Sequence, residues 1–230
     1  MQILALDTST QWMSVALYDG TRAIAVREHV GNASSERLLP AIRELLDRAC
    51  IALERLDGIA FGAGPGAFTG VRIACAVAQG LAFGADLSVF GVSTLDALAQ
   101  AAWREHRWPR VIACLDARMR EVYMAASERR DNGMASVCAP SVVKPDEVAR
   151  PDDGEWWGAG DGFAAYPGLA PRLGLAASDA ALIPDAQSIA ECAWPRVVAG
   201  EGVPAEHAEP LYVRHRVALT SAERAAGLRL

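Results

Sequence analysis

The chain has 230 residues, of which 52% are hydrophobic and 22% charged. This composition excludes a disordered chain or a coiled coil and supplies enough apolar side chains for a sizeable core. The formal net charge of -6 disfavours extensive binding to a nucleic-acid backbone, which binds proteins mainly through Lys and Arg. The five cysteines form no CxxC pair, and MQILALDTST lacks the basic start of a signal peptide. We therefore expect a cytoplasmic protein with no membrane span.

The first fifty residues predict strands followed by a helix. Three strands are expected, at 3–7, 13–18 and 23–28. Asp19 and Gly20 separate the last two strands and are a strong signal for a hairpin turn. From Ser34 onward the apolar residues recur with helical spacing. Because Pro40 lies inside this pattern, the helix either begins near Glu36 or is kinked.

A glycine-rich stretch, FGAGPGAFTGVR at 61–72, follows an expected strand at 56–61 and precedes an expected helix at 70–84. A loop between a strand and a helix is a place where free N–H groups favour an anion. Gly64 and Gly66 belong to it, but it lacks the lysine of a phosphate loop, and Ala67 stands where a dinucleotide motif needs glycine. Two interpretations stay open: a nucleotide-binding loop, or a sharp turn that allows close packing.

The second half of the chain partly repeats the first. Val111–Asp116 resembles Ile3–Asp7, because each is an apolar run that ends in Leu-Asp and is followed by a polar turn and a return strand. This predicts an α/β protein with two related domains, although such runs also occur by chance. We place the domains at 1–105 and 106–230. The polar segment 104–110 mixes arginine with tryptophan and is either a solvated linker or a contact for RNA.

The remaining elements are predicted by the same patterns. They are strands at 87–92, 111–116 and 121–126, helices at 94–103 and 187–199, and loops at 151–154 and 158–162.

Asp7 and Asp116 are the candidate carboxylates of a nucleotide site, together with Gly64 and Gly66. In sugar-kinase-like folds an aspartate at the end of the first strand helps to hold magnesium beside phosphates. Each aspartate has a second interpretation, in which it only satisfies the N–H groups of its own turn. No catalytic residue and no metal site are predicted, because the four histidines form no HxxxH or HExxH and no serine lies in GxSxG.

The helix at 70–84 is apolar on more than one side, so both sides must be covered. It is either an internal helix between two layers or a helix whose second side is covered by another protein. With the preceding helix, the second interpretation predicts a partner interface formed by Leu38, Ile42, Ile73, Ala76, Val77, Gly80 and Phe83.

Several segments together resemble the bacterial TsaB (YeaZ) family: LALDTST, SERLLPAI, FGAGPGAFTGVRIACAVAQGLAFG, GVSTLDALA, LDARMREVYMA and EPLYVR. The resemblance covers 1–127 and returns at 209–214. It implies the actin-like ATPase fold with two ribonuclease-H-like domains, in agreement with the duplication. It also implies a role in forming N6-threonylcarbamoyladenosine (t6A) at adenosine 37, next to the anticodon of tRNAs that read codons starting with A.

The resemblance further implies a non-catalytic subunit. In this family the paralogue TsaD is catalytic and TsaE is an ATPase, so we expect pairing with TsaD and only indirect contact with tRNA. The metal-binding HxxxH of TsaD corresponds to Thr94 and Leu98 here, neither of which can hold a metal ion. The resemblance also implies a possible homodimer, and ATP or ADP, if present, at a subunit boundary. The alternatives are an independent ATPase or small-molecule kinase and, with less support, a glycoprotease-type peptidase.

Overall fold

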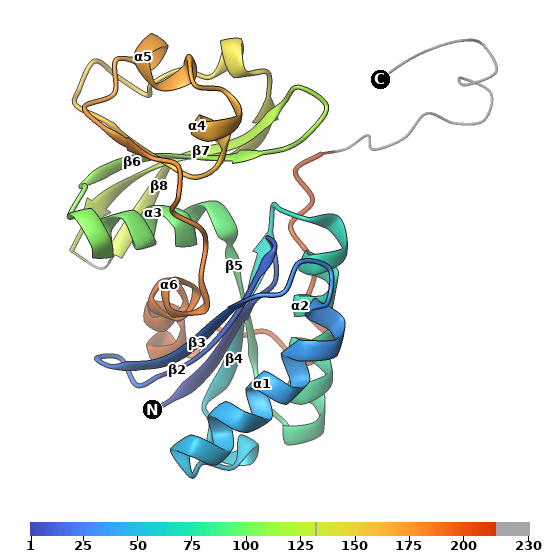
Figure 1. Ribbon diagram of the computed structural model, residues 1–230. Coiled ribbons are helices and arrows are strands. Elements are labelled where there is room, and N and C mark those ends of the chain that lie inside the picture. Colours follow the sequence, from blue (N-terminus) through green and yellow to red (C-terminus); the bar gives the residue numbers. More distant parts are fainter. Residues whose placement is uncertain (132, 215–230) are drawn as a thin grey trace, which may run out of the picture.

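Two five-stranded sheets form the protein, whose computed structural model describes residues 1–131 and 133–214 (Figure 1). The first sheet contains β1 (Ile3–Asp7), β2 (Trp12–Tyr18), β3 (Ala23–His29), β4 (Gly58–Gly64) and β5 (Val89–Ser93). The second contains β6 (Arg110–Asp116), β7 (Val122–Arg130), β8 (Gly133–Val143), β9 (Trp157–Ala159) and β10 (Ser178–Asp179).

The two sheets have the same topology. The spatial order is β3-β2-β1-β4-β5 in the first and, read from the same end, β8-β7-β6-β9-β10 in the second. In each, three antiparallel strands in a meander are followed by two strands parallel to the first strand of the meander. The predicted duplication and the actin-like α/β fold are confirmed.

In the part of the chain that the structure describes, six α-helices lie around and between the sheets. They are α1 (Ser34–Ala49), α2 (Phe68–Ala85), α3 (Thr94–His106), α4 (Gly162–Ala165), α5 (Leu169–Leu173) and α6 (Ala186–Ala199). Three short 3-10 turns, at Leu53–Arg55, Pro145–Glu147 and Ala205–His207, complete the described elements. Figure 1 shows α1 and α2 side by side on one face of the first sheet, and α3 between the two sheets.

Side chains of β1 alternate between two cores because successive residues of a strand point to opposite faces. Leu4 and Leu6 belong to the core beneath α1 and α2, whereas Ile3 and Ala5 belong to the core beneath α6. On the second face of this sheet, the small side chains of Ala5, Ala16 and Ala60 allow α6 to lie close to β1, β2 and β4.

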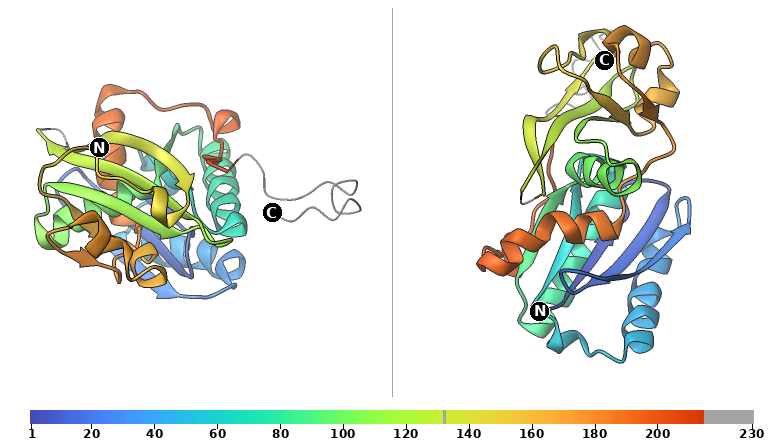
Figure 2. Two further views of the ribbon diagram at one scale, coloured as in Figure 1. Left: turned by 90° about the horizontal axis from the view of Figure 1, so that it is seen from above. Right: turned by 90° about the vertical axis from the view of Figure 1, so that its left-hand side faces the viewer.

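The C-terminal part of the described chain returns to the first domain. Figure 2 shows α6 on the face of the first sheet opposite α1, and its Ile189 and Ala193 are fully buried there. Further on, Val203 pairs with Val89 at the edge of the sheet. The expected second domain at 106–230 is therefore not one unit. The second sheet with α4 and α5 spans 110–179, whereas α6 and Val203 pack on the first sheet. Arg214 then contacts Ala117 and Glu121 after β6, and 215–230 lie outside the described residues.

Several expected boundaries also need correction. The segment 104–110 is no linker, because Arg104–His106 form the last turn of α3 and Arg110 begins β6. The helix α1 begins at Ser34, so Pro40 lies inside it rather than in its first turn. Pro40 is exposed, so water can solvate the carbonyl group that the missing N–H leaves free. The expected loop at 158–162 contains the end of β9 and the start of α4.

Among residues 1–131 and 133–214, α2 alone is long and apolar enough to cross a membrane. A core helix passes the same test, and the inner side of α2 packs in the core of the first sheet through Ala74, Ala78 and Ala82.

Candidate functional site

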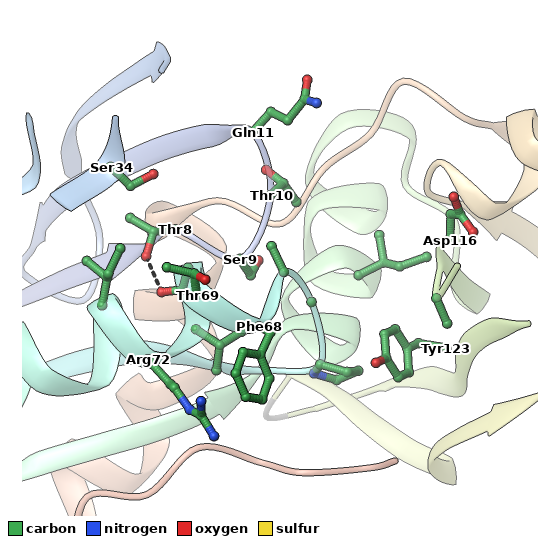
Figure 3. Close-up of a pocket in the computed structure, with 18 of the residues that line it drawn as sticks. Thr8, Ser9, Thr10, Gln11, Ser34, Phe68, Thr69, Arg72, Asp116 and Tyr123 are labelled. Atoms are coloured by element: carbon green, nitrogen blue, oxygen red, sulfur yellow. Dashed lines mark hydrogen bonds between the residues drawn. The ribbon is translucent and has the colours of Figure 1, made fainter. Parts of the chain in front are cut away.

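A cleft of about 1420 Å³ lies between the two halves, where the turns after β1 and β6 meet the start of α2 (Figure 3). Figure 3 shows Thr8, Ser9 and Thr69 on one side of the cleft and Asp116 and Tyr123 on the other. Residues of the glycine loop and of the C-terminal segment complete the lining, among them Gly66, Phe68, Arg72, Tyr212 and Arg214.

The backbone of Thr8 and Ser9 occupies the space beside two glycines of the loop. A Cβ atom on Gly70 would overlap the carbonyl oxygen of Thr8, and one on Gly66 would lie 2.5 Å from that of Ser9. The hydroxyl of Thr8 donates to the Gly70 carbonyl at 2.6 Å, and the N–H of Ala67 donates to the Ser9 carbonyl at 2.7 Å. These contacts favour the sharp-turn interpretation, because the glycines give the Thr8–Ser9 backbone room to approach.

Gly64 has a different role from Gly66. Its φ of 104° is in the region that favours glycine, and the Leu211 carbonyl oxygen would lie 3.3 Å from a Cβ atom there. Leu211 also donates its N–H to the Ala63 carbonyl at 2.7 Å. Gly64 therefore lets the C-terminal segment pass close to β4, and it does not line the cleft.

Asp7 is buried beneath the loop, with 1% of its surface exposed. Its Oδ2 accepts hydrogen bonds from the N–H and the hydroxyl of Ser9 at 3.2 and 3.0 Å, whereas Oδ1 has no partner among the described residues. Burial raises the pKa of Asp7 to about 7, because the low-dielectric interior disfavours the charged carboxylate. A Cβ atom on Gly62 would overlap Oδ1, so this glycine makes room for the carboxyl group.

Asp116 lines the cleft but is held by its own turn. Its Oδ1 accepts the N–H of Arg118 at 2.9 Å, and its Oδ2 lies 3.0 Å from the Arg118 guanidinium. The N–H of Asp116 in turn donates to Asp161 at 2.9 Å, and the pKa of Asp161 is raised mainly by burial. The structure thus places Asp116 and Gly66 at the cleft but leaves Asp7 and Gly64 out of its lining.

The sequence analysis missed the basic and aromatic rim of the cleft. The Arg72 guanidinium lies 3.5 Å from the centre of the Phe68 ring and 5.5 Å from that of Tyr212, and its Nε donates to the Tyr212 hydroxyl at 2.9 Å. Arg214 donates to the Ala117 carbonyl at 3.1 Å and pairs with Glu121. The basic and aromatic residues of EPLYVR were a signal for this rim, but their partners lie far away in the sequence.

No group of three His, Cys, Asp or Glu side chains is placed to hold a metal ion in 1–131 and 133–214. Thr94 and Leu98, which we expected at the positions of the TsaD metal ligands, are both fully buried. The Thr94 hydroxyl donates to the Pro65 carbonyl and so ties α3 to the glycine loop.

The exposed side of α2 is apolar. Ala76, Gly80 and Phe83 are exposed, and 79% of the Phe83 surface is accessible. Ile73 and Val77 are half-buried at the edge of the first core. The helix is therefore not internal on both sides, and this surface of Ile73, Ala76, Val77, Gly80 and Phe83 is called the α2 face below.

Leu38 and Ile42 do not belong to an exposed surface. They are 0% and 3% exposed, because their side of α1 packs on the sheet as part of the first core. The exposed apolar residue of α1 is Leu39, at 50%. The predicted interface is corrected at these two positions.

The comparisons with known proteins agree with this fold over nearly the whole chain. The family model TsaD, tRNA N6-adenosine threonylcarbamoyltransferase, matches residues 24–191. The tRNA threonylcarbamoyladenosine biosynthesis protein TsaB of Escherichia coli (strain K12) is 40% identical over 95% of this chain and 96% of its own length. TsaB of Haemophilus influenzae is 37% identical over 94% of this chain and 95% of its own. The structure of YeaZ from Pseudomonas aeruginosa has a TM-score of 0.87 and 46% identity, covering 92% of this chain and 99% of that one.

Proposed function

The chain belongs to the TsaB (YeaZ) family, and we propose that it is a non-catalytic subunit of the machinery that forms t6A in tRNA. A role in t6A biosynthesis follows from the family. The finer proposal is that the α2 face binds the catalytic paralogue TsaD and supports its active arrangement, together with TsaE, for tRNAs that read codons starting with A. A cytoplasmic location belongs to the same proposal.

The α2 face carries this proposal. An apolar surface with a largely exposed phenylalanine is typical of a protein–protein interface. Its small residues, Ala76 and Gly80, would let a partner helix approach closely. A homodimer through the same face is proposed when TsaD is absent.

The nucleotide-site residues support a role without ATP hydrolysis. Magnesium beside a nucleotide needs carboxylates that reach the site, but Asp7 is buried and does not line the cleft. The Ala67 N–H is already bonded to Ser9. ATP or ADP at a boundary between this cleft and a partner remains a proposal, supported by the size of the cleft and by Arg72 on its rim. We also propose that tRNA is held mainly by other subunits, since the net charge is -6.

The test is pairing with purified TsaD, measured by the mass of the complex in solution. Replacing Gly80 with Arg or Phe83 with Glu places a charge on the α2 face, and we expect at least about tenfold weaker pairing and reduced t6A formation. Ile24→Glu is the matched control, because Ile24 is 46% exposed on β3, away from this face. Normal pairing and normal t6A formation by both α2 variants would contradict the proposal.

A further inference from the structure

A second hollow of about 570 Å³ lies between the end of α3, α6 and the hairpin of β7 and β8, and it shares no lining residue with the cleft. Its walls include Trp103 and Arg107 from α3 and its cap, Arg129 from β7, and Trp194 and Val198 from α6. We call it the Trp103 groove.

Two arginines flank the ring of Trp103. The guanidinium carbons of Arg107 and Arg129 lie 5.5 and 5.1 Å from the ring centre, within range of a cation–π interaction. In the part of the chain that the structure describes, neither guanidinium has a carboxylate within 4.0 Å. Among the described residues, two guanidinium groups without a direct ion pair therefore lie beside an aromatic ring, in a chain whose net charge is negative.

The third arginine of the groove has a structural role. Arg104 pairs with Asp185 at 2.6 Å and with Glu191 at 3.7 Å, and it donates to Ser188 at 2.7 Å. These contacts join α3 to α6, and the single charge of Arg104 is shared between the two carboxylates. Asp131 is the other carboxylate of the lining; it is exposed at the tip of the hairpin.

The other side of the groove is apolar. Trp194 packs edge-on against Tyr18 with ring centres 5.3 Å apart, which fixes the position of its indole. A Cβ atom on Gly20 would overlap this ring, so the hairpin turn is shaped to receive it. Val198 beside it is 60% exposed. The groove thus has one cationic wall and one rigid apolar wall.

This arrangement suits a ligand that joins a flat ring to an anionic group. Unpaired nucleotides have this chemistry, because their bases stack on aromatic side chains and their phosphates bind arginine. An acidic peptide would use the two arginines but leave the aromatic wall unused. We propose that the Trp103 groove binds an unpaired stretch of RNA, with a base against the aromatic wall and the phosphates beside Arg107 and Arg129. The choice of RNA rests on the proposed function in tRNA modification.

The groove remains open when the α2 face is covered. The helix α6 lies on the face of the first sheet opposite α1 and α2 (Figure 2), and the end of α3 lies next to α6. A partner bound to the α2 face and an RNA in the groove can therefore be held at the same time. The polar segment that begins at Arg104 then has a direct role in binding, although the chain as a whole is acidic.

The test measures binding of a fluorescein-labelled, unstructured RNA of ten nucleotides to the purified full chain at 50 mM salt. The double variant Arg107→Gln, Arg129→Gln is expected to bind at least about tenfold more weakly, with a salt slope reduced by about 1.4 for two phosphates. Trp194→Leu is expected to weaken binding about 5- to 150-fold with an unchanged salt slope, and Trp194→Phe to restore most of it. An RNA duplex of equal length should displace the labelled single strand poorly.

The control for charge alone is Arg130→Gln, one residue from Arg129. Arg130 is exposed, pairs with Glu128 at 2.6 Å and does not line the groove, so its replacement removes one arginine charge elsewhere. It should change RNA binding less than twofold. The proposal is overturned if the wild-type chain does not bind the single strand, if the groove double variant binds as well as this control, or if the duplex competes equally.

Pairing with TsaD is measured on the same variants, so the two proposals fail separately. The groove variants are expected to pair normally. Loss of pairing with intact RNA binding would assign the groove to a protein partner and overturn the assignment to RNA. Normal pairing by the α2 variants would contradict the proposed function but leave the RNA measurement, made on the chain alone, fully interpretable.

Discussion

The turns after β1 and β6 occupy equivalent places in two sheets of the same topology, but one is buried and the other exposed. Thr8 and Ser9 are buried and bonded to the glycine loop. In the second turn, 82% of the Arg118 side chain is exposed, and residues 118–120 all have positive φ values between 54° and 60°.

The side chains that follow the shared Leu-Asp pair explain this difference. Small Thr8 and Ser9 can be buried against glycines, whereas the long side chains of Arg118 and Met119 must remain in solvent. The duplicated topology therefore gives two functional possibilities. The first turn packs against the glycine loop, and the second leaves the exposed side chain of Arg118 at the cleft.

The largest expected effect tests whether the first turn depends on close packing. Gly70→Ala forces a methyl group into the carbonyl of Thr8, and we expect a loss of at least about 3 kcal/mol in the free energy of unfolding, measured with urea. Gly80→Ala on the same helix is the control, since nothing lies within 4 Å of its Cβ position, and it should stabilise by about 0.5–1 kcal/mol. Equal effects of the two changes would show that the turn is loosely packed.

The next effect concerns Asp7 and depends on pH. Because its folded pKa of about 7 exceeds its ordinary value of 3.8, the folded state binds this proton more tightly than the unfolded state. The resulting stability is complete below about pH 4 and is lost as pH rises to about 7, by up to about 4 kcal/mol.

Asp7→Asn removes this dependence. The difference in unfolding free energy between variant and wild type should increase from pH 4 to pH 7 in favour of the variant, and stay constant above. Other titrating groups cancel in this difference. If the unfolding free energies of variant and wild type differ by the same amount at every pH, Asp7 ionises in the folded protein as it does in the unfolded chain.

The smallest effect is expected at the second turn. Arg118→Ala removes an exposed ion pair with Asp116 at 3.0 Å, and such pairs contribute about 0–1 kcal/mol. We therefore expect less than about 1 kcal/mol of destabilisation by thermal or urea unfolding. If Arg118→Ala lowered the unfolding free energy as much as Gly70→Ala does, the two turns would not differ in their contribution to stability.

The duplication was predictable from the sequence because it rests on local patterns. The apolar runs of β1 and β6 and their shared Leu-Asp ends are both visible in the amino acids. The short strands β9 and β10, with three and two residues, offer too little alternation to detect. The size of Thr8 and Ser9 was an available signal for burial, but their contact with the glycine loop depends on residues some 60 positions away.

The interface prediction failed where one pattern had two possible causes. Helical periodicity at Leu38 and Ile42 shows that one side of α1 is covered, but not whether the sheet or a partner covers it. For α2 the second apolar side was a better signal of an exposed apolar surface, since a single sheet cannot cover both sides of one helix. The return of α6 was not predictable, because its buried alanines and Ile189 could pack equally well on either sheet.

The return of α6 also sets an order of events on the ribosome. Ile3 and Ala5 leave the exit tunnel early, yet Ile189 and Ala193, which cover them, are made roughly 190 residues later, about 10–40 s at 5–20 residues per second. All strands of the second sheet, which is contiguous in 110–179, are also made before α6. The N-terminal strand β1 is therefore translated first, but one of its faces is covered last. That apolar face stays exposed until the ribosome has made α6.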